Sequence, residues 1–173
     1  MLDGVVIEGG DAKGFSYHNK GGALIAYHAG KTYSPFEKDH TGFKMEIKNC
    51  VFKDNKAYEG GAIYAFSKAD LNISNTTFIG NSANNGGAIM DREGNKINCQ
   101  KCTFENNVAS ISGGATYEDY GSHALYQDSS FIDNKATYKG GAIYVISRAS
   151  QLEATELTVK NSKFEGNKAK EGE

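Results

Sequence analysis

Acidic residues recur at matching places in two neighbouring segments of the chain, and they are the first candidates for chemistry. They are Asp91, Glu93, Glu118 and Asp119, with Arg92 and Arg148 nearby. Two carboxylates beside a basic residue can act as general acid and base on a polysaccharide, and carboxylate oxygens also bind Ca²⁺. A solvated row of turns would carry the same residues only for solubility. Catalysis, Ca²⁺ binding and a solvated edge are therefore three alternatives for this patch.

Tyrosines form a second candidate set, Tyr64, Tyr117 and Tyr144, and Met90 stands at the equivalent position of another segment. An exposed row of aromatic rings can stack on sugars or anchor a partner protein. Stacked rings also stabilise neighbouring strands without any ligand. We expect this row to face outward, and both roles stay open.

The pair Cys99-Gln-Lys-Cys102 has the C-x-x-C spacing of half a zinc site or of a redox pair. No second C-x-x-C and no clustered histidine accompanies it, so we predict no metal centre and no cofactor, with Ca²⁺ at the acidic patch as the alternative. Cys50 makes the cysteine count odd, which does not indicate a disulfide framework. We expect the cysteines to fill the core, and a Cys99–Cys102 disulfide stays open.

A repeat accounts for the spacing of all these residues. Its first half reads Phe-x-x-Asn-x-Ala and occurs at Phe52-Asn55-Ala57, Phe78-Asn81-Ala83, Phe104-Asn107-Ala109, Phe131-Asn134-Ala136 and Phe164-Asn167-Ala169. Its second half reads Gly-Gly-Ala and begins with Gly21-Gly22, Gly60-Gly61, Gly86-Gly87, Gly113-Gly114 and Gly140-Gly141. Successive phenylalanines lie 26, 26, 27 and 33 residues apart. A period of this length is typical of a solenoid.

The repeat indicates an all-β fold. Its units show period-2 alternation of apolar and polar residues, as in 71–74 and 157–160, and they lack the 3.6-residue pattern of a helix. Gly, Asn and Asp separate these runs. Roughly three short strands and three corners fill each unit, which predicts a single-stranded parallel β-helix of about 5–6 coils, with strands about 4.8 Å apart.

Each fixed residue then has a structural task. Phe points inward and stacks on its copies, Asn adopts the left-handed conformation at a corner and forms a hydrogen-bonded ladder, and Ala keeps that corner narrow. Gly-Gly permits the next bend. The strand that follows should point Ile63, Ile89, Thr116 and Ile143 inward, and this turns the tyrosine row outward.

Composition narrows the class of protein further. Residues 1–173 fit one domain, and a net charge of −2 argues against a nucleic-acid surface. No apolar run is long enough to span a membrane, so any link to a membrane would come through flanking segments.

Stretches near 30–42 and 147–154 exceed the repeat, and such insertions form outer loops that often bind ligands. Because the last copy reaches residue 172 without its Gly-Gly-Ala, we expect these residues to be part of a longer array.

The combination of Phe-x-x-Asn with Gly-Gly-Ala-Ile resembles the repeats of the chlamydial polymorphic outer membrane proteins and of adhesin-like surface proteins, over residues 2–172. The resemblance implies a right-handed parallel β-helix that is displayed outside the cell at the outer membrane, like an autotransporter passenger. It also implies adhesion to a protein or glycan on another cell. Gly-Gly-Ala-Ile is intact at 60, 86 and 140 but reads Gly-Gly-Ala-Leu at 21 and Gly-Gly-Ala-Thr at 113. The family motifs are structural and carry no catalytic residue over to this chain.

Three functions are compatible with the sequence. The first is a structural and adhesive segment of a cell-surface or secreted protein, which binds its partner through loops or a lateral face. The second is the core of a carbohydrate-active β-helix enzyme, a polysaccharide lyase or hydrolase. The third is a rigid spacer without a ligand. We favour the first and expect no enzyme, because no long insert follows the acidic patch to form a cleft over it.

Overall fold

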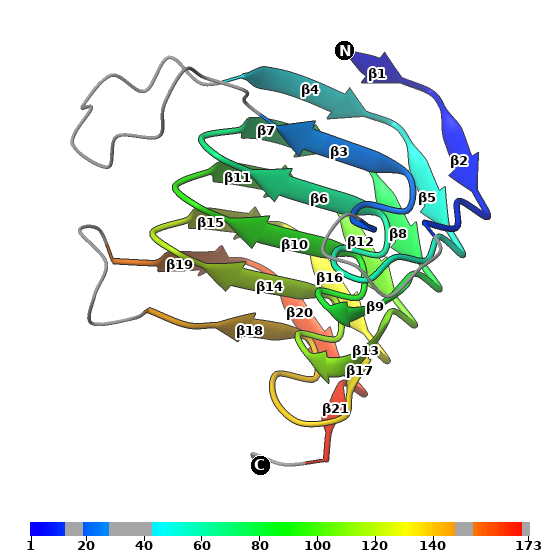
Figure 1. Cartoon of the computed structure of the whole chain (residues 1–173), viewed down its shortest axis with the longest axis vertical. Helices are drawn as coiled ribbons and strands as arrows, with labels where there is room; N and C mark the ends of the chain where they lie inside the picture. Colours follow the sequence, from blue (N-terminus) through cyan, green and yellow to red (C-terminus); the bar gives the residue numbers. More distant parts are fainter. Residues whose placement is uncertain (13–18, 28–42, 148–153, 171–173) are drawn as a thin grey trace.

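The computed structural model describes residues 1–12, 19–27, 43–147 and 154–170 (Figure 1). Every regular element in these ranges is a β-strand. None of the described residues forms a helix of the length and apolarity needed to cross a membrane. The strands pair in parallel and form four ladders, which confirms the predicted parallel β-helix.

We name the ladders sheets A to D in the order in which the chain visits them. Sheet A contains β1 (Leu2–Asp3), β4 (Lys44–Lys48), β7 (Asp70–Ser74), β11 (Lys96–Gln100), β15 (His123–Gln127) and β19 (Glu156–Lys160). Sheet B contains β2 (Val6–Glu8), β5 (Val51–Lys53), β8 (Thr77–Ile79), β12 (Thr103–Glu105), β16 (Ser130–Ile132) and β20 (Lys163–Glu165). Sheet C contains β9 (Ser82–Asn85), β13 (Val108–Ser112), β17 (Lys135–Ala136) and β21 (Lys168–Ala169). Sheet D contains β3 (Leu24–Tyr27), β6 (Ile63–Phe66), β10 (Ile89–Arg92), β14 (Thr116–Asp119) and β18 (Ile143–Val145).

One coil passes through sheets A, B, C and D, and the chain then begins the next coil in sheet A. The third coil consists of β7 to β10, the fourth of β11 to β14 and the fifth of β15 to β18. Figure 1 shows the coils stacked from the N-terminus at the top to the C-terminus at the bottom.

The structure has four strands in a full coil, where the sequence predicted three. A corner at each conserved Asn separates the strand of sheet B from that of sheet C. The left-handed conformation at this corner was predicted for the Asn itself, but it belongs to the preceding residue. That residue has a φ of 53° at Asp54, 67° at Gly80, 54° at Asn106 and 52° at Asp133.

Equivalent phenylalanines stack directly on one another through the coils. Phe52, Phe78, Phe104, Phe131 and Phe164 are register partners in sheet B. Their ring centroids lie 4.7 to 5.0 Å apart and their planes differ by 4° to 7°. This separation matches that of neighbouring β-strands, so ring stacking and backbone pairing are satisfied by the same spacing. The first four rings pack with aliphatic residues of sheets A and D into one core, whereas Phe164 of the last described coil is 47% exposed.

The conserved asparagines form the predicted ladder inside the corner. Asn107 Nδ2 donates to Asn134 Oδ1 at 2.9 Å and to the Phe78 carbonyl at 3.0 Å. Asn107 Oδ1 accepts from Asn81 Nδ2 and from the Asn81 backbone N–H, both at 3.0 Å. The same pattern continues from Asn55 to Asn167. The ladder therefore satisfies backbone groups that the corner leaves without strand partners.

The two glycines of each Gly-Gly unit have different tasks. Gly86 has a φ of 62°, a conformation that turns the chain and that glycine adopts without strain. Gly87 is required by space, because a Cβ there would lie 2.1 Å from the Gly114 carbonyl oxygen of the next coil. Only glycine at the second position allows the coils to approach at strand spacing.

We predict that Asn107→Ala strongly destabilises the protein. The change leaves the Asn81 amide and the Phe78 carbonyl without side-chain partners, and each buried unpaired group costs about 1–3 kcal/mol. The free energy of unfolding in urea should therefore fall by roughly 3 kcal/mol. The matched control is Asn98→Ala, whose exposed side chain donates to Asn72 and which should cost about 0.5 kcal/mol or less. Equal losses in the two variants would contradict a structural role for the ladder.

A pair of Gly→Ala variants separates the two reasons for glycine. Gly94 has a φ of +68° but open space around it, with Lys68 Cγ at 4.0 Å as the nearest atom, so Gly94→Ala should cost about 1–2 kcal/mol. Gly87→Ala should cost more than about 4 kcal/mol, because backbone atoms of the next coil would have to move. Thermal unfolding followed by circular dichroism measures both. A Gly87→Ala protein as stable as the Gly94→Ala protein would contradict this explanation.

Candidate functional site

The alternation of side chains along sheet D divides the predicted acidic patch between two faces. Ile63 and Ala65 of β6 belong to the core, and the same two positions of β10 hold Ile89 and Asp91. Glu118 of β14 is the register partner of Asp91. Both acidic residues are 0% exposed. The predicted solvated edge is therefore wrong for these two residues, which point into the interior of the coil.

Asp91 and Glu118 are hydrogen-bonded to other side chains of the interior. Asn95 Nδ2 donates to Asp91 Oδ1 at 2.6 Å, and the Tyr126 hydroxyl donates to Glu118 Oε1 at 2.6 Å. Burial raises the pKa of Asp91 well above its usual range, and the neighbouring Glu118 raises that pKa further. Burial also raises the pKa of Glu118. A carboxyl enclosed in this way cannot contact an extended polysaccharide, so these two residues do not form the surface pair that the catalytic alternative requires.

The other two acidic residues lie elsewhere. Glu93 is half-buried in the turn after β10 with a φ of 72°, and burial raises its pKa. Asp119 is the register partner of Arg92 and accepts a hydrogen bond from the Tyr120 N–H at 2.8 Å. Arg148 lies outside the described residues. Within the described ranges, no group of three or more His, Cys, Asp and Glu side chains could hold a metal ion.

The tyrosine row lies on the outer side of sheet D, but it is not exposed. Tyr64 and Met90 are each 2% exposed and Tyr117 is 8% exposed. The row forms a second apolar cluster, apart from the core, with Phe66, Tyr144 and Ile146 partly buried against it. The row faces outward as expected, but Tyr64 and Tyr117 are not exposed as the sugar-stacking alternative requires. Their contacts within the cluster indicate that they stabilise the stacked strands.

The side chains of Lys20, Arg92 and Glu59 lie on the same outer side of sheet D. Lys20 Nζ lies 3.5 Å from Glu59 Oε2, and Arg92 Nη1 lies 3.9 Å from Glu59 Oε1. Lys20 Nζ also donates to the Tyr64 hydroxyl at 2.6 Å and lies 4.2 Å from the centroid of that ring. The Arg92 guanidinium lies 4.7 Å from the Tyr120 ring centroid. Because Glu59 is buried, these contacts are sheltered from water and help to cover the aromatic row.

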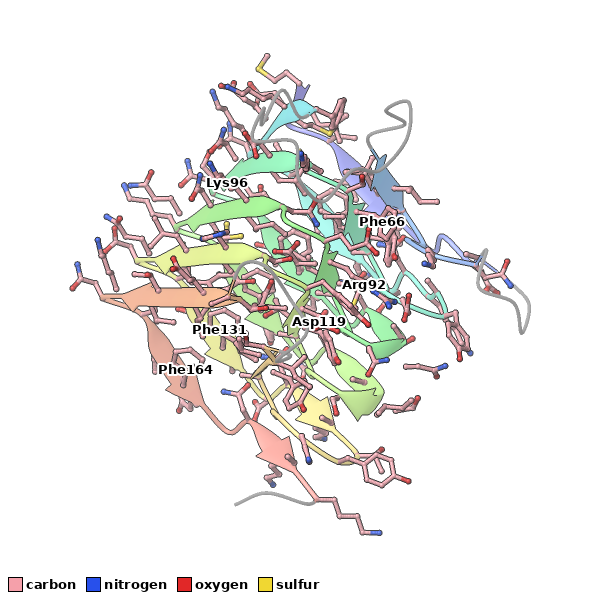
Figure 2. All side chains as sticks on the ribbon, turned by 60° about the vertical axis from the view of Figure 1, so that its left-hand side comes forward. Phe66, Arg92, Lys96, Asp119, Phe131 and Phe164 are labelled. Carbon is pink, nitrogen blue, oxygen red and sulfur yellow. The ribbon has the colours of Figure 1, made fainter. Side chains whose placement is uncertain are left out.

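The sequence did not identify Lys20 and Glu59 as site residues. Each directly precedes a Gly-Gly unit, and the two residues are bridged to each other in parallel. The position before Gly-Gly differs in type between copies, and this variation is the signal that could have identified them. Figure 2 shows this side of the molecule, where Phe66, Arg92 and Asp119 lie on successive levels of sheet D.

Sheet A presents a second lateral face, which is polar. A row of register partners runs along it through Lys44, Asp70, Lys96, His123 and Glu156. A shallow depression crosses β11, β15 and β19, and its outward-pointing residues are Lys96, Asn98, His123, Leu125, Glu156 and Thr158. His123 Nδ1 lies 3.1 Å from Glu156 Oε2 within it. In Figure 2, Lys96 lies apart from Arg92 and Asp119.

All three cysteines are buried and free, as core residues would be. Burial raises the pKa of the Cys99 thiol. A hydrogen bond with Cys99 lowers the pKa of Cys102, whose sulfur also contacts the Gln100 carbonyl at 3.5 Å. The open possibility of a Cys99–Cys102 disulfide is not realised in this structure.

The chain was compared with models of known protein families. A model described as a right handed beta helix region matches residues 3–172. The chain belongs to the right-handed β-helix family. The predicted hand of the solenoid is thereby confirmed, and the family includes both enzymes and structural proteins. Comparison with curated proteins and with solved structures gave no match.

Membership of the right-handed β-helix family accounts for the ladders and the corners without selecting a ligand. The finer resemblance to chlamydial surface repeats lies beyond this match and stays a prediction. The repeated residues are alike in the coils of this β-helix. Its faces therefore differ from one another through the residues that vary between coils. The depression on sheet A is the exposed polar surface among them, whereas the acidic pair and the tyrosine row are enclosed.

We predict that the thiols are inaccessible in the folded protein. Cys50, Cys99 and Cys102 are each 1% exposed, so the native protein should react with Ellman's reagent far more slowly than a free thiol. In guanidinium chloride without reductant, all three should titrate. Titration of Cys50 alone after unfolding would reveal a disulfide between the other two. Rapid reaction of the folded protein would contradict the assignment of the cysteines to the core.

Proposed function

We propose that this β-helix is a rigid structural and adhesive segment of a cell-surface or secreted protein, and that it binds a glycan through the outer face of sheet A. The observation that carries the proposal is the depression over β11, β15 and β19. It is lined by donors and acceptors on strands whose positions are fixed by stacking. A site on strands is held more firmly than a site on loops.

The chemistry of the depression suits sugar hydroxyls. The Lys96 ammonium supplies donors, the Glu156 carboxylate supplies acceptors, and Asn98 supplies both. The His123–Glu156 contact at 3.1 Å holds both side chains in place before a ligand arrives. Asn98 Nδ2 donates to Asn72 at 3.0 Å, which orients that amide as well. These polar groups repeat along the strand-stacking direction, as an extended chain of sugar units would require.

The sequence resemblance supports display outside the cell. It links the paired motifs to surface proteins that adhere to other cells, and the family match is consistent with a structural β-helix. The predicted insertions offer the other route to a partner. Residues 30–42 lie outside the described residues, and so does 147–154 apart from Ser147 and Ala154.

The two alternatives differ in what supports them. For a lyase or hydrolase, the acidic residues that suggested it are divided between the interior, a turn and the outer cluster of sheet D. For a rigid spacer, the support is the uniform stacking of every coil. The spacer needs no exposed site, so a binding experiment separates it from the proposal.

The proposal predicts binding on a glycan array that is lost when the depression is changed. A hydrogen bond to a charged group contributes about 1.5–3 kcal/mol and an ordinary one about 0.5–1.5 kcal/mol, so Lys96→Ala should weaken binding about tenfold or more and His123→Ala several-fold. Glu105→Ala, on the outer face of sheet B, is the matched control and should bind as the unmodified protein does. Isothermal titration with the best array ligand measures the change. Absence of binding to any glycan would overturn the proposal and favour the spacer. Binding that both depression variants retain would overturn the assignment of the site to sheet A.

A further inference from the structure

The interior of the β-helix contains a pair of acids stacked on one another. Asp91 of the third coil and Glu118 of the fourth are register partners, and both carboxyls are enclosed. The equivalent positions of the second and fifth coils hold Ala65 and Val145. The pair is thus a local exception within an otherwise apolar column.

The hydrogen bonds of the pair leave one oxygen of each carboxyl without a donor. Asp91 Oδ1 accepts from Asn95, and Glu118 Oε1 accepts from Tyr126. Asp91 Oδ2 and Glu118 Oε2 are buried without a hydrogen-bond partner, as is the Thr116 hydroxyl, and the Ser122 hydroxyl donates to the Asp119 carbonyl at 2.7 Å. Two ionised carboxylates can only accept, so neither can supply the missing donor to the other. Two buried like charges in contact would also repel each other strongly.

We propose that Asp91 and Glu118 share a bound proton inside the solenoid, and that this acid pair makes the stacking of the third and fourth coils sensitive to pH. The proton resides on Asp91 Oδ2, and this hydroxyl donates to Glu118 Oε2. Both unpartnered oxygens are then satisfied by a single hydrogen bond. Glu118 accepts it together with the bond from Tyr126.

The surroundings of the pair favour its protonated form. The groups that face it are Cys99 from β11, Tyr126 from β15, the Thr116 and Ser122 hydroxyls, and the Asn95 amide at the corner. No lysine, arginine or histidine is among the groups that shift the pKa of either carboxyl. Burial, the largest cause, raises the pKa of both acids. The hydrogen bonds from Asn95 to Asp91 and from Tyr126 to Glu118 lower these pKa values in part, but no cation adds to their effect.

The pH dependence of stability follows from the direction of these shifts. The unfolded chain releases both protons near pH 4, the ordinary range of carboxyls, whereas the folded chain keeps the shared proton to higher pH. The contribution of this pair to stability is therefore greatest in acid and falls as the pH rises from about 4 to the raised pKa of the pair. Each retained proton changes the ratio of folded to unfolded protein by up to tenfold per pH unit.

The experiment is equilibrium unfolding of the full chain in urea between pH 4 and 9, comparing the unmodified protein with Asp91→Asn/Glu118→Gln. The amides keep the shapes of the acids and one can donate to the other, but neither titrates in this range. The double variant should lose the decline with pH, and the two curves should converge toward acid. Glu105→Gln, on the outer face of β12, is the control and should keep the decline.

Infrared spectroscopy tests the proton directly. The folded protein at neutral pH should show the carbonyl stretch of a protonated carboxylic acid, and the double variant should lack it. This measurement decides the matter even if the double variant unfolds, because the unmodified protein either has the band or lacks it. Absence of the band, or equal pH dependence in the two proteins, would overturn the proposal. Stoichiometric metal by mass spectrometry, with stability lost to a chelator, would overturn it in favour of a buried cation.

Discussion

Parallel hydrogen bonds between coils place each residue directly against its counterpart in the next coil. The Ala88 N–H donates to the Ala115 carbonyl at 2.8 Å, and equivalent bonds recur around the coil. Because neighbouring strands are held about 4.8 Å apart, a side chain must fit beside a copy of itself. Phenylalanine meets this condition by stacking, asparagine by donating to one copy and accepting from the other, and glycine by leaving room. The residues of the repeat motif are those that can stack on copies of themselves at this spacing.

The same constraint separates structural positions from positions that can serve a ligand. Interior positions must be compatible with their copies, so their variety is small. Outward positions on sheet A have no such limit, and the row that includes Asp70, Lys96 and His123 changes character from coil to coil. Such variation gives the lateral face a pattern of donors and acceptors at fixed spacing. The fold supplies the rigidity, and the differences between copies supply the specificity of any binding surface.

The fold could be predicted from the sequence because residues that stack on their counterparts must recur once in every coil, and this recurrence is visible as a repeat. Phe104 could be assigned to the stacked column and Asn107 to the ladder from their spacing alone. The bend was assigned to both glycines of the Gly-Gly unit, whereas Gly114 is needed for room, since a Cβ there would lie 2.0 Å from the Gly141 carbonyl oxygen. The interior position of Asp91 was also encoded, since it lies two residues after Ile89 in a strand. All three alternatives for the acidic patch placed these residues at the surface, and for Asp91 and Glu118 this was wrong. The burial of Tyr64 was not predictable, because it depends on Lys20, which is 44 residues distant in sequence.

The acidic pair shows how a solenoid accommodates an interior exception. In the column of Asp91, the second and fifth coils hold Ala65 and Val145, so no third carboxyl adjoins the pair. Each acid is accompanied by its own donor at a position where other coils carry a different residue. Tyr126 donates a hydrogen bond to Glu118, and its register partners in the two preceding coils are Cys99 and Ile73. Asn95 donates a hydrogen bond to Asp91. Its Oδ1 also accepts from the Ala69 N–H at 2.7 Å, which stabilises the corner. Polarity in this core is therefore local, and the proposed shared proton would satisfy the oxygen of each acid that has no other partner.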